Sequence, residues 1–204
     1  MSSKTLHLEF GDKTRHQVNT DELIATLPGD TIGEKVTRYV TEVLHPEFQD
    51  INSTVTSKEG IEVSTQDIQK IQSLRNKLIG AILLQRTETN IPEKQSIQKE
   101  LEPILESVAL LYSRMLVAYC HSEIDELNKL KEKFWQEVES RHYGTSHFHR
   151  LIDGAKNIET IARGLSRKNI RESILEQCAS IRAAYKQITA YNDDYRNRRA
   201  RHQD

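Results

Sequence analysis

The stretch at residues 103–119, PILESVALLYSRMLVAY, is the most apolar run of the chain. Its hydrophobic residues surround the helix axis instead of forming one stripe, which is typical of a buried helix. We therefore expect the other helices to pack around it. Pro103 suits the first turn of this helix, where a missing N–H costs nothing. Ser122 and Asp125 then indicate that a new helix begins after it.

The composition around this stretch favours a soluble, mainly α protein. Of the 204 residues, 36% are hydrophobic and 29% are charged, with only eight Gly and four Pro, a balance that excludes disordered and collagen-like chains. We predict a helical bundle over residues 64–204 and a small N-terminal α+β element, a β-hairpin plus helix, over residues 1–63. No signal-peptide pattern and no run of about 18 apolar residues occurs, so the chain is predicted to be cytoplasmic.

The N-terminal element is predicted from two patterns. Apolar residues alternate with polar ones from Leu6 to Phe10, and residues 15–18 follow as a returning strand. A helix with a face at Val36, Val40 and Leu44 then follows, and His45-Pro46 is expected to stop it. The β-branched run that begins at Ile51 predicts a second hairpin over residues 51–63.

The helices of the bundle are predicted from capping residues and apolar spacing. Ser64 and Asp67 form a capping-box pattern, and the helix that they begin is expected to end near Arg86. In the last predicted helix, apolar residues recur at intervals of four and three, a spacing typical of a coiled-coil-like seam. A homo-oligomer or a protein partner is predicted through this seam: Ile174, Cys178, Ile181, Tyr185 and Ile188.

Charge is divided unevenly along the chain. Residues 1–140 carry 16 Lys and Arg against 23 Asp and Glu, a net charge of −7, whereas residues 141–204 carry 13 against 7, a net charge of +6. The C-terminal third is therefore expected to face something anionic, which could be nucleic acid, an acidic protein or the acidic part of another copy.

Two groups of basic residues are candidate phosphate-binding sites. The first surrounds the predicted start of the last helix, where unpaired backbone N–H groups already favour an anion; its members are Arg163, Arg167, Lys168 and Arg171. The second lies in the C-terminal run YRNRRARHQD and comprises Arg196, Arg198, Arg199 and Arg201. Both groups predict contact with the backbone of RNA or DNA.

Three histidines in the run HYGTSHFH, His142, His147 and His149, are candidate metal ligands, since neutral imidazoles bind zinc. The alternative is a polar loop with surface histidines, because the chain offers no fourth ligand nearby. Cys120 and His121 lie at the other end of a helix of about 20 residues, which spans roughly 30 Å. No metal and no other cofactor is therefore predicted.

The C-terminal run also contains an arginine, a polar residue and, a few positions on, a histidine: Arg196, Asn197 and His202. Over these seven residues the chain resembles the motif of the HEPN ribonuclease family. The resemblance implies metal-independent RNA cleavage by a dimer of helical domains. The histidine would handle the proton of the 2′-hydroxyl, and the arginine would stabilise charge on the phosphate.

Three function hypotheses follow from these patterns. The leading one is a non-enzymatic interaction or scaffold subunit of a larger assembly, whose basic C-terminal third contacts nucleic-acid phosphates. The first alternative is the HEPN-like ribonuclease with Arg196, Asn197 and His202 as catalytic residues. The second is a protein-only adaptor that binds through the C-terminal helix. The sequence contains no phosphate-binding glycine loop, HExxH, CxxC or Gly-flanked nucleophilic serine.

Overall fold

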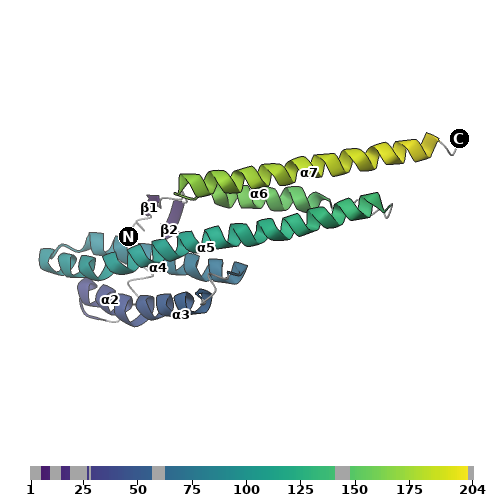
Figure 1. Cartoon of the computed structure of the whole chain (residues 1–204). Coiled ribbons are helices and arrows are strands. Elements are labelled where there is room, and N and C mark those ends of the chain that lie inside the picture. The colour runs from purple at the N-terminus through teal and green to yellow at the C-terminus, as the bar shows by residue number, and fades with distance from the viewer. Residues whose placement is uncertain are drawn as a thin grey trace. The chain divides into compact units, whose positions relative to one another are not determined.

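The computed structural model describes residues 6–9, 15–18, 27, 29–56, 63–140 and 148–201. It confirms the mainly α class and the helical bundle (Figure 1). The chain forms two compact units, unit 1 over Met1–Ala118 and unit 2 over Tyr119–Asp204. The predicted division at residue 63 falls inside unit 1.

Unit 1 begins with two short strands, β1 (Leu6–Glu9) and β2 (Arg15–Val18). They pair antiparallel, with Leu6 opposite Val18 and Glu9 opposite Arg15. Residues 10–14 and 19–26, including Phe10 of the predicted strand, lie outside the described residues. The small N-terminal α+β element as a folding unit stays a prediction.

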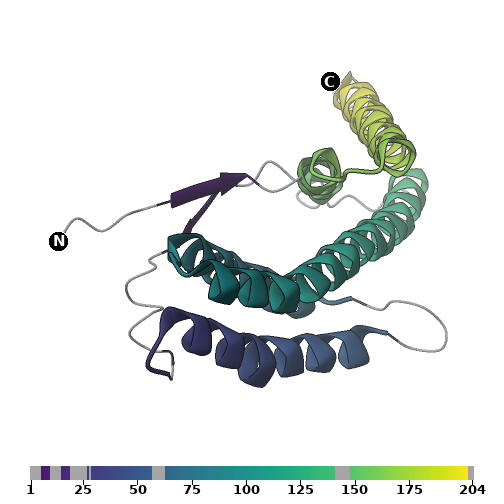
Figure 2. The same ribbon diagram turned by 90° about the vertical axis from the view of Figure 1, so that its left-hand side faces the viewer.

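The next helix is longer than predicted. It comprises α2 (Ile32–Tyr39), a π-helical turn η1 (Val40–Leu44) and α3 (His45–Val55), which follow one another along one rod (Figure 2). The expected stop at His45-Pro46 is wrong. In the wider π turn the N–H of His45 donates to the carbonyl of Val40, five residues earlier, and this turn carries the chain past the proline.

The second predicted hairpin, over residues 51–63, is wrong in its first strand, which is helical. Its first part continues α3, where Ile51 and Val55 lie one turn apart and are 3% and 1% exposed. Burial of these two side chains in the core of unit 1 outweighs the β propensity of the run between them. Residues 57–62 lie outside the described residues.

Helix α4 (Thr65–Thr87) begins as predicted. The Ser64 hydroxyl accepts from the Asp67 N–H, and the Asp67 carboxylate accepts from the Ser64 N–H at 2.9 Å, which completes the capping box. Ion pairing with α3 holds one side of α4, since Lys77 Nζ lies 2.6 Å from Glu47 Oε2.

Helix α5 (Ile91–Glu139) is a single helix of 49 residues and belongs to both units. The predicted break at Pro103 and the new start at Ser122 are both wrong. Pro103 is exposed, and the Ser107 hydroxyl satisfies its carbonyl at 2.8 Å. No residue between Tyr119 and Ser122 ends the helix, and the buried positions continue from Cys120 to Ile124.

The central stretch of α5 is buried on one face only, which corrects the expectation that its apolar residues are covered on all sides. Ile104, Val108, Leu111 and Met115 are at most 4% exposed, whereas Leu110 is 53% exposed. The buried face joins apolar residues of α2, η1, α3 and α4 in the core of unit 1. By length and composition α5 could also cross a membrane, but core helices of soluble proteins pass the same test.

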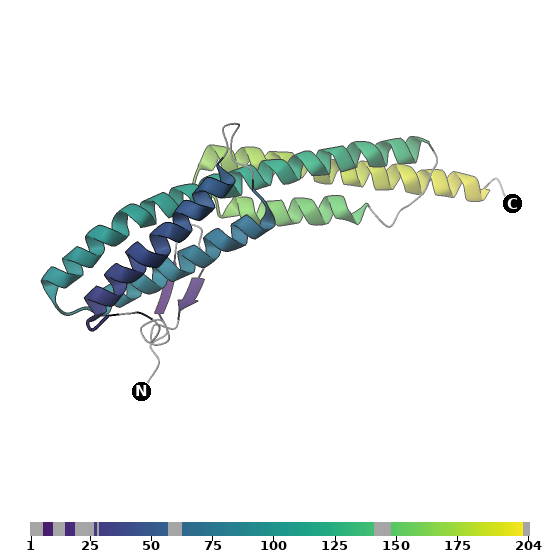
Figure 3. The same ribbon diagram turned by 90° about the horizontal axis from the view of Figure 1, so that it is seen from below.

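Unit 2 contains the end of α5 with α6 (His149–Arg163) and α7 (Lys168–Arg201). Helices α6 and α7 lie side by side (Figures 1 and 3). Phe148 packs on Phe134 of α5 with ring centroids 4.9 Å apart. Gly154 lets α5 approach α6 closely, because a Cβ there would lie 2.7 Å from Leu127 Cδ2.

Candidate functional site

The turn between α6 and α7 brings the first predicted group of basic residues together. Helix α6 ends at Arg163, with Gly164 as its C-cap, and Leu165 is buried at 3% exposure. The N–H groups of Gly164 and Leu165 bond back to α6 at 3.0 Å each, so the turn is short and fixed. Arg163, Arg167 and Lys168 are exposed on it.

The four cations of this turn differ in what they contact. Arg171 is half-buried and donates from Nη1 to the Leu165 carbonyl at 3.2 Å, so it stabilises the turn itself. Lys168 lies 3.8 Å from Glu172, an exposed pair of little energetic weight. Among the described residues, Arg163 and Arg167 have no carboxylate partner. These two side chains are the ones left to meet an external anion.

The second predicted basic group lies at the other end of α7. Arg198 pairs with Asp194 at 2.8 Å, and Asn197 is exposed. The side chains of Arg196, Arg199 and Arg201, and the whole of His202, lie outside the described residues. Arg198 is 30 residues from Lys168 on the same helix, which corresponds to about 45 Å. The two basic groups are therefore separate sites.

The predicted histidine cluster is described only in part. His149 opens α6, and its Nδ1 lies 3.3 Å from the Tyr185 hydroxyl of α7. His142 and His147 lie outside the described residues. Within the part of the chain that the structure describes, no three His, Cys, Asp or Glu side chains are grouped to hold a metal ion.

The predicted seam of α7 is part of the core of unit 2. Ile174, Cys178, Ile181 and Ile188 are each at most 1% exposed, and Tyr185 is half-buried. The seam extends one step further, to Asn192, which is 2% exposed. These residues are already covered within the chain, so an oligomer through the seam would require α7 to separate from its neighbours.

Buried polar groups lie close to this seam. Glu159 of α6 is 6% exposed, and its Oε1 lies 3.1 Å from Nε of Arg182 on α7 without the alignment of a hydrogen bond.

The two cysteines of unit 2 have raised pKa values. Burial raises the pKa of the Cys178 thiol, and the charge of Glu159 raises this pKa further, whereas the charge of Arg182 lowers it. Burial, together with Cys178 and Glu123, raises the pKa of Cys120 to about 12. Both thiols are therefore protonated and unreactive at neutral pH.

A groove between α6 and α7 was missed by the sequence reasoning. It has a volume of about 380 Å³ and is lined by Ile152 and Lys156 of α6 and by Ala179, Arg182, Ala183 and Lys186 of α7. Three of these lining side chains are apolar and three are cations. The signal was present in the sequence, because Ala179 with Ala183 and Arg182 with Lys186 are both spaced four apart and share one helix face.

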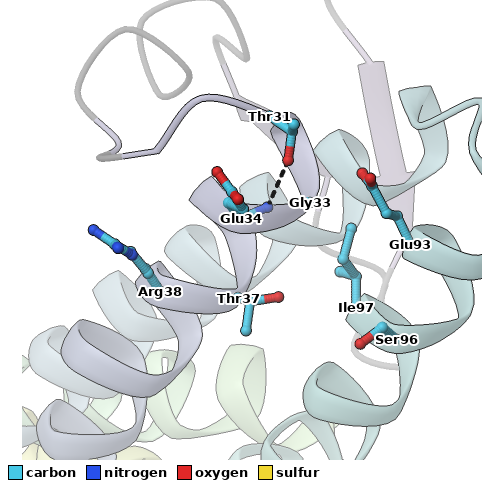
Figure 4. A pocket seen from close by; sticks show the side chains of 8 residues that line it. All are labelled: Thr31, Gly33, Glu34, Thr37, Arg38, Glu93, Ser96 and Ile97. Atoms are coloured by element: carbon cyan, nitrogen blue, oxygen red, sulfur yellow. Dashed lines mark hydrogen bonds between the residues drawn. The ribbon is translucent and has the colours of Figure 1, made fainter.

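A second hollow of about 380 Å³ lies in unit 1 between α2 and the start of α5 (Figure 4). Three of its polar side chains already serve local structure. Thr31 Oγ1 accepts from the Glu34 N–H at 3.1 Å, Glu34 Oε2 accepts from the Asp30 N–H, and Glu93 accepts from Asn90. These contacts cap α2 and start α5, so they account for the polar side chains of Thr31, Glu34 and Glu93 by local structure.

Comparisons with protein-family models, with curated proteins and with solved structures each find no match. The functional argument therefore rests on the residues and geometry of this chain. Among the residues that the structure describes in full, the basic turn and the basic groove of unit 2 are candidate binding sites.

Proposed function

We propose that the protein is a non-enzymatic helical subunit of a larger assembly, cytoplasmic, that contacts nucleic-acid phosphates through its basic C-terminal third. The observation that carries this proposal is the turn between α6 and α7. It holds Arg163 and Arg167 exposed, without carboxylate partners among the described residues, beside the N-terminus of α7. Guanidinium groups next to free backbone N–H groups suit phosphate oxygens.

This arrangement supports backbone contact without base reading. Among the described residues of the turn, no exposed aromatic side chain lies beside the basic ones to stack on a base. Tyr191 is 51% exposed, but it is 23 residues further along α7 than Lys168, about 35 Å away. Binding should therefore depend on charge and vary little with sequence.

The test is binding of single-stranded RNA and duplex DNA, measured by fluorescence anisotropy at several salt concentrations. The logarithm of affinity should fall linearly with the logarithm of salt concentration, with a slope of about −0.7 to −0.9 per phosphate contact. Replacing Arg163, Arg167 and Lys168 together by Gln should weaken binding at least about tenfold and make the slope shallower by about two.

The matched control replaces Lys129, Lys131 and Lys133 of α5 by Gln. It removes the same charge from the same unit, away from the turn, and should change affinity far less. Absence of binding even at low salt would overturn the proposal. Equal losses in the two triple variants would show that only net charge matters and would remove the turn as the site.

The ribonuclease alternative rests on the resemblance at Arg196, Asn197 and His202. Arg196 and Asn197 lie in the last turns of α7, and the geometry of His202 is not described. If the alternative holds, the purified protein cleaves a mixed RNA substrate, and His202→Ala abolishes cleavage while RNA binding persists. An uncut substrate rules it out.

The N-terminal strand pair adds a separate proposal. We infer that β1, β2 and the neighbouring helices form a small α+β element, which offers a surface to a protein partner of the assembly. Antiparallel pairing of Leu6 with Val18 supports it. Deleting residues 1–20 should leave helix content and melting of the bundle unchanged while weakening capture of that partner.

A further inference from the structure

The groove between α6 and α7 combines features that a phosphate backbone alone would not use. Its lining combines three apolar side chains, Ile152, Ala179 and Ala183, with three cations, Lys156, Arg182 and Lys186. Small side chains spaced four apart let another helix approach closely. Cations beside apolar side chains are complementary to a helix face that carries acidic residues next to an apolar residue. The groove therefore fits an acidic amphipathic helix.

The cations of the groove are available for such a helix. Lys156 and Lys186 are exposed and have no carboxylate partner among the described residues. Arg182 differs, because its Nε faces the buried Glu159 at 3.1 Å while 42% of its side chain remains exposed. Glu159 thus holds Arg182 in place by one nitrogen, and the two terminal nitrogens can receive an external carboxylate.

The chain itself contains a face of this chemistry on α5. Glu102, Glu106 and Leu110 follow one another at intervals of four and are all exposed, Leu110 at 53%. They lie on the side of α5 away from the core of unit 1, which is formed by Ile104, Val108 and Leu111. Glu106 has no cation partner among the described residues, and Glu102 accepts only from Gln98 at 2.6 Å.

We propose that the groove between α6 and α7 receives this acidic face of α5 from a second copy of the chain. Two residues four apart on a helix are separated by about 6 Å along the axis. Glu102 and Glu106 therefore match the spacing of Lys186 and Arg182 when the two helices run antiparallel. In that register Leu110, one turn beyond Glu106, falls over Ala179, one turn before Arg182.

The contact joins different surfaces of the two copies, one on unit 1 and the other on unit 2. It can close reciprocally between two copies or continue as a chain of copies. One groove of about 380 Å³ corresponds to a small interface. Such an interface associates weakly, and its exposed charge pairs weaken further as salt rises.

The test is sedimentation velocity of the full chain, freed of nucleic acid, over a concentration series at ionic strengths of about 0.02 M and about 0.5 M. At low ionic strength the average mass should rise with concentration, and at high ionic strength the association constant should fall at least about tenfold. Leu110→Ala should weaken association about tenfold at both ionic strengths, because it removes the apolar part of the contact.

Charge reversal separates this proposal from its alternatives. Lys156→Glu with Lys186→Glu, and separately Glu102→Lys with Glu106→Lys, should each abolish association. Mixing the two double variants should restore it, because the unchanged acidic face of the groove variant then meets the unchanged basic groove of the face variant. Lys129→Glu with Lys133→Glu, an equal charge change on α5, should leave association intact.

Two results overturn the proposal. The first is a monomer at every concentration at low ionic strength. The second is association that the charge-reversed variants do not change or that their mixture does not restore. Thermal denaturation followed by circular dichroism shows whether the bundle is intact in each variant. Because all four reversed side chains are exposed, the melting temperatures of the variants should match that of the parent chain. RNA binding at the turn between α6 and α7 is measured separately. Neither of these two results confirms or excludes it.

Discussion

The two units differ in how they treat polar groups in their cores. In the described part of unit 1, the two buried polar side chains, Arg75 and Gln85, each have a partner. Arg75 lies over the Tyr112 ring at 4.1 Å, and Gln85 donates to the Lys94 carbonyl at 3.4 Å. In unit 2, Glu159 and Asn192 are as deeply buried, yet each has a side-chain oxygen without a hydrogen bond.

This difference indicates a division of roles. Unit 1 is stabilised by a continuous apolar cluster that runs through α2, η1, α3, α4 and α5. In unit 2, the unsatisfied Oδ1 of Asn192 reduces the gain from burial, because an unsatisfied buried oxygen costs about 1–3 kcal/mol, whereas the charge of Arg182 offsets the burial of Glu159. The same unit presents the exposed cations of the turn and of the groove. We infer that unit 1 supplies more of the stability and that unit 2 carries the basic surfaces proposed for binding, to which unit 1 adds the acidic face of α5.

The largest expected effect tests the one-sided burial of α5 in unit 1. Leu111→Asp places a carboxylate at a site that is 3% exposed, and it should cost more than about 4 kcal/mol and unfold unit 1. Leu110→Asp, one residue earlier and 53% exposed, should change stability by less than about 0.5 kcal/mol. Urea denaturation followed by circular dichroism measures both. Equal losses would show that the core is misplaced.

The second prediction concerns the pH dependence of unit 2. The pKa of Cys120 rises from an ordinary 9.0 to about 12 on folding, mainly because the thiol is buried. The folded state therefore keeps this proton more tightly than the unfolded state. The stability that it contributes is complete below about pH 9 and is lost as the pH rises toward about 12, by about 1.4 kcal/mol per pH unit.

Urea denaturation between pH 8 and pH 11 should show this loss in the parent chain and a smaller one in Cys120→Ala. Cys120→Ala also removes volume from the core, so the comparison is between slopes and not between absolute stabilities. Parallel slopes would contradict a buried, protonated thiol. Fast reaction of both thiols with a disulfide reagent in the folded protein would contradict it as well.

The sequence predicted what depends on local chemistry. The capping box at Ser64 and Asp67 follows from side chains within one turn of each other. It failed where distant packing overrides local signals. Pro46 was expected to end a helix and Pro103 to begin one, but a π turn accommodates the first inside a longer helix and an exposed position accommodates the second.

The candidate sites divide in the same way. Arg163, Arg167 and Lys168 are near each other in sequence, so their clustering at the turn was predictable. The groove needs Lys156 from α6 beside Arg182 and Lys186 from α7, and only the pairing of the two helices brings them together. The apolar periodicity of α7 indicated a seam that must be covered, but it did not indicate which surface covers it. In the structure, other parts of the same chain cover the seam.

The smallest predicted effect tests the cost of buried polar groups in unit 2. Asn192 occupies a seam position, is 2% exposed, and its Oδ1 has no hydrogen-bond donor. Asn192→Leu keeps a similar volume and removes the unsatisfied oxygen, so it should stabilise unit 2 by about 1 kcal/mol. Asn197→Leu, at an exposed position five residues later on α7, is the control and should change little. Thermal denaturation of both variants measures the difference. If Asn192→Leu instead lowers stability, the amide has a favourable role in the seam. Buried asparagines have such a role where they fix the register of packed helices. The contrast between the two cores would then lie in the specificity of helix packing and not in stability.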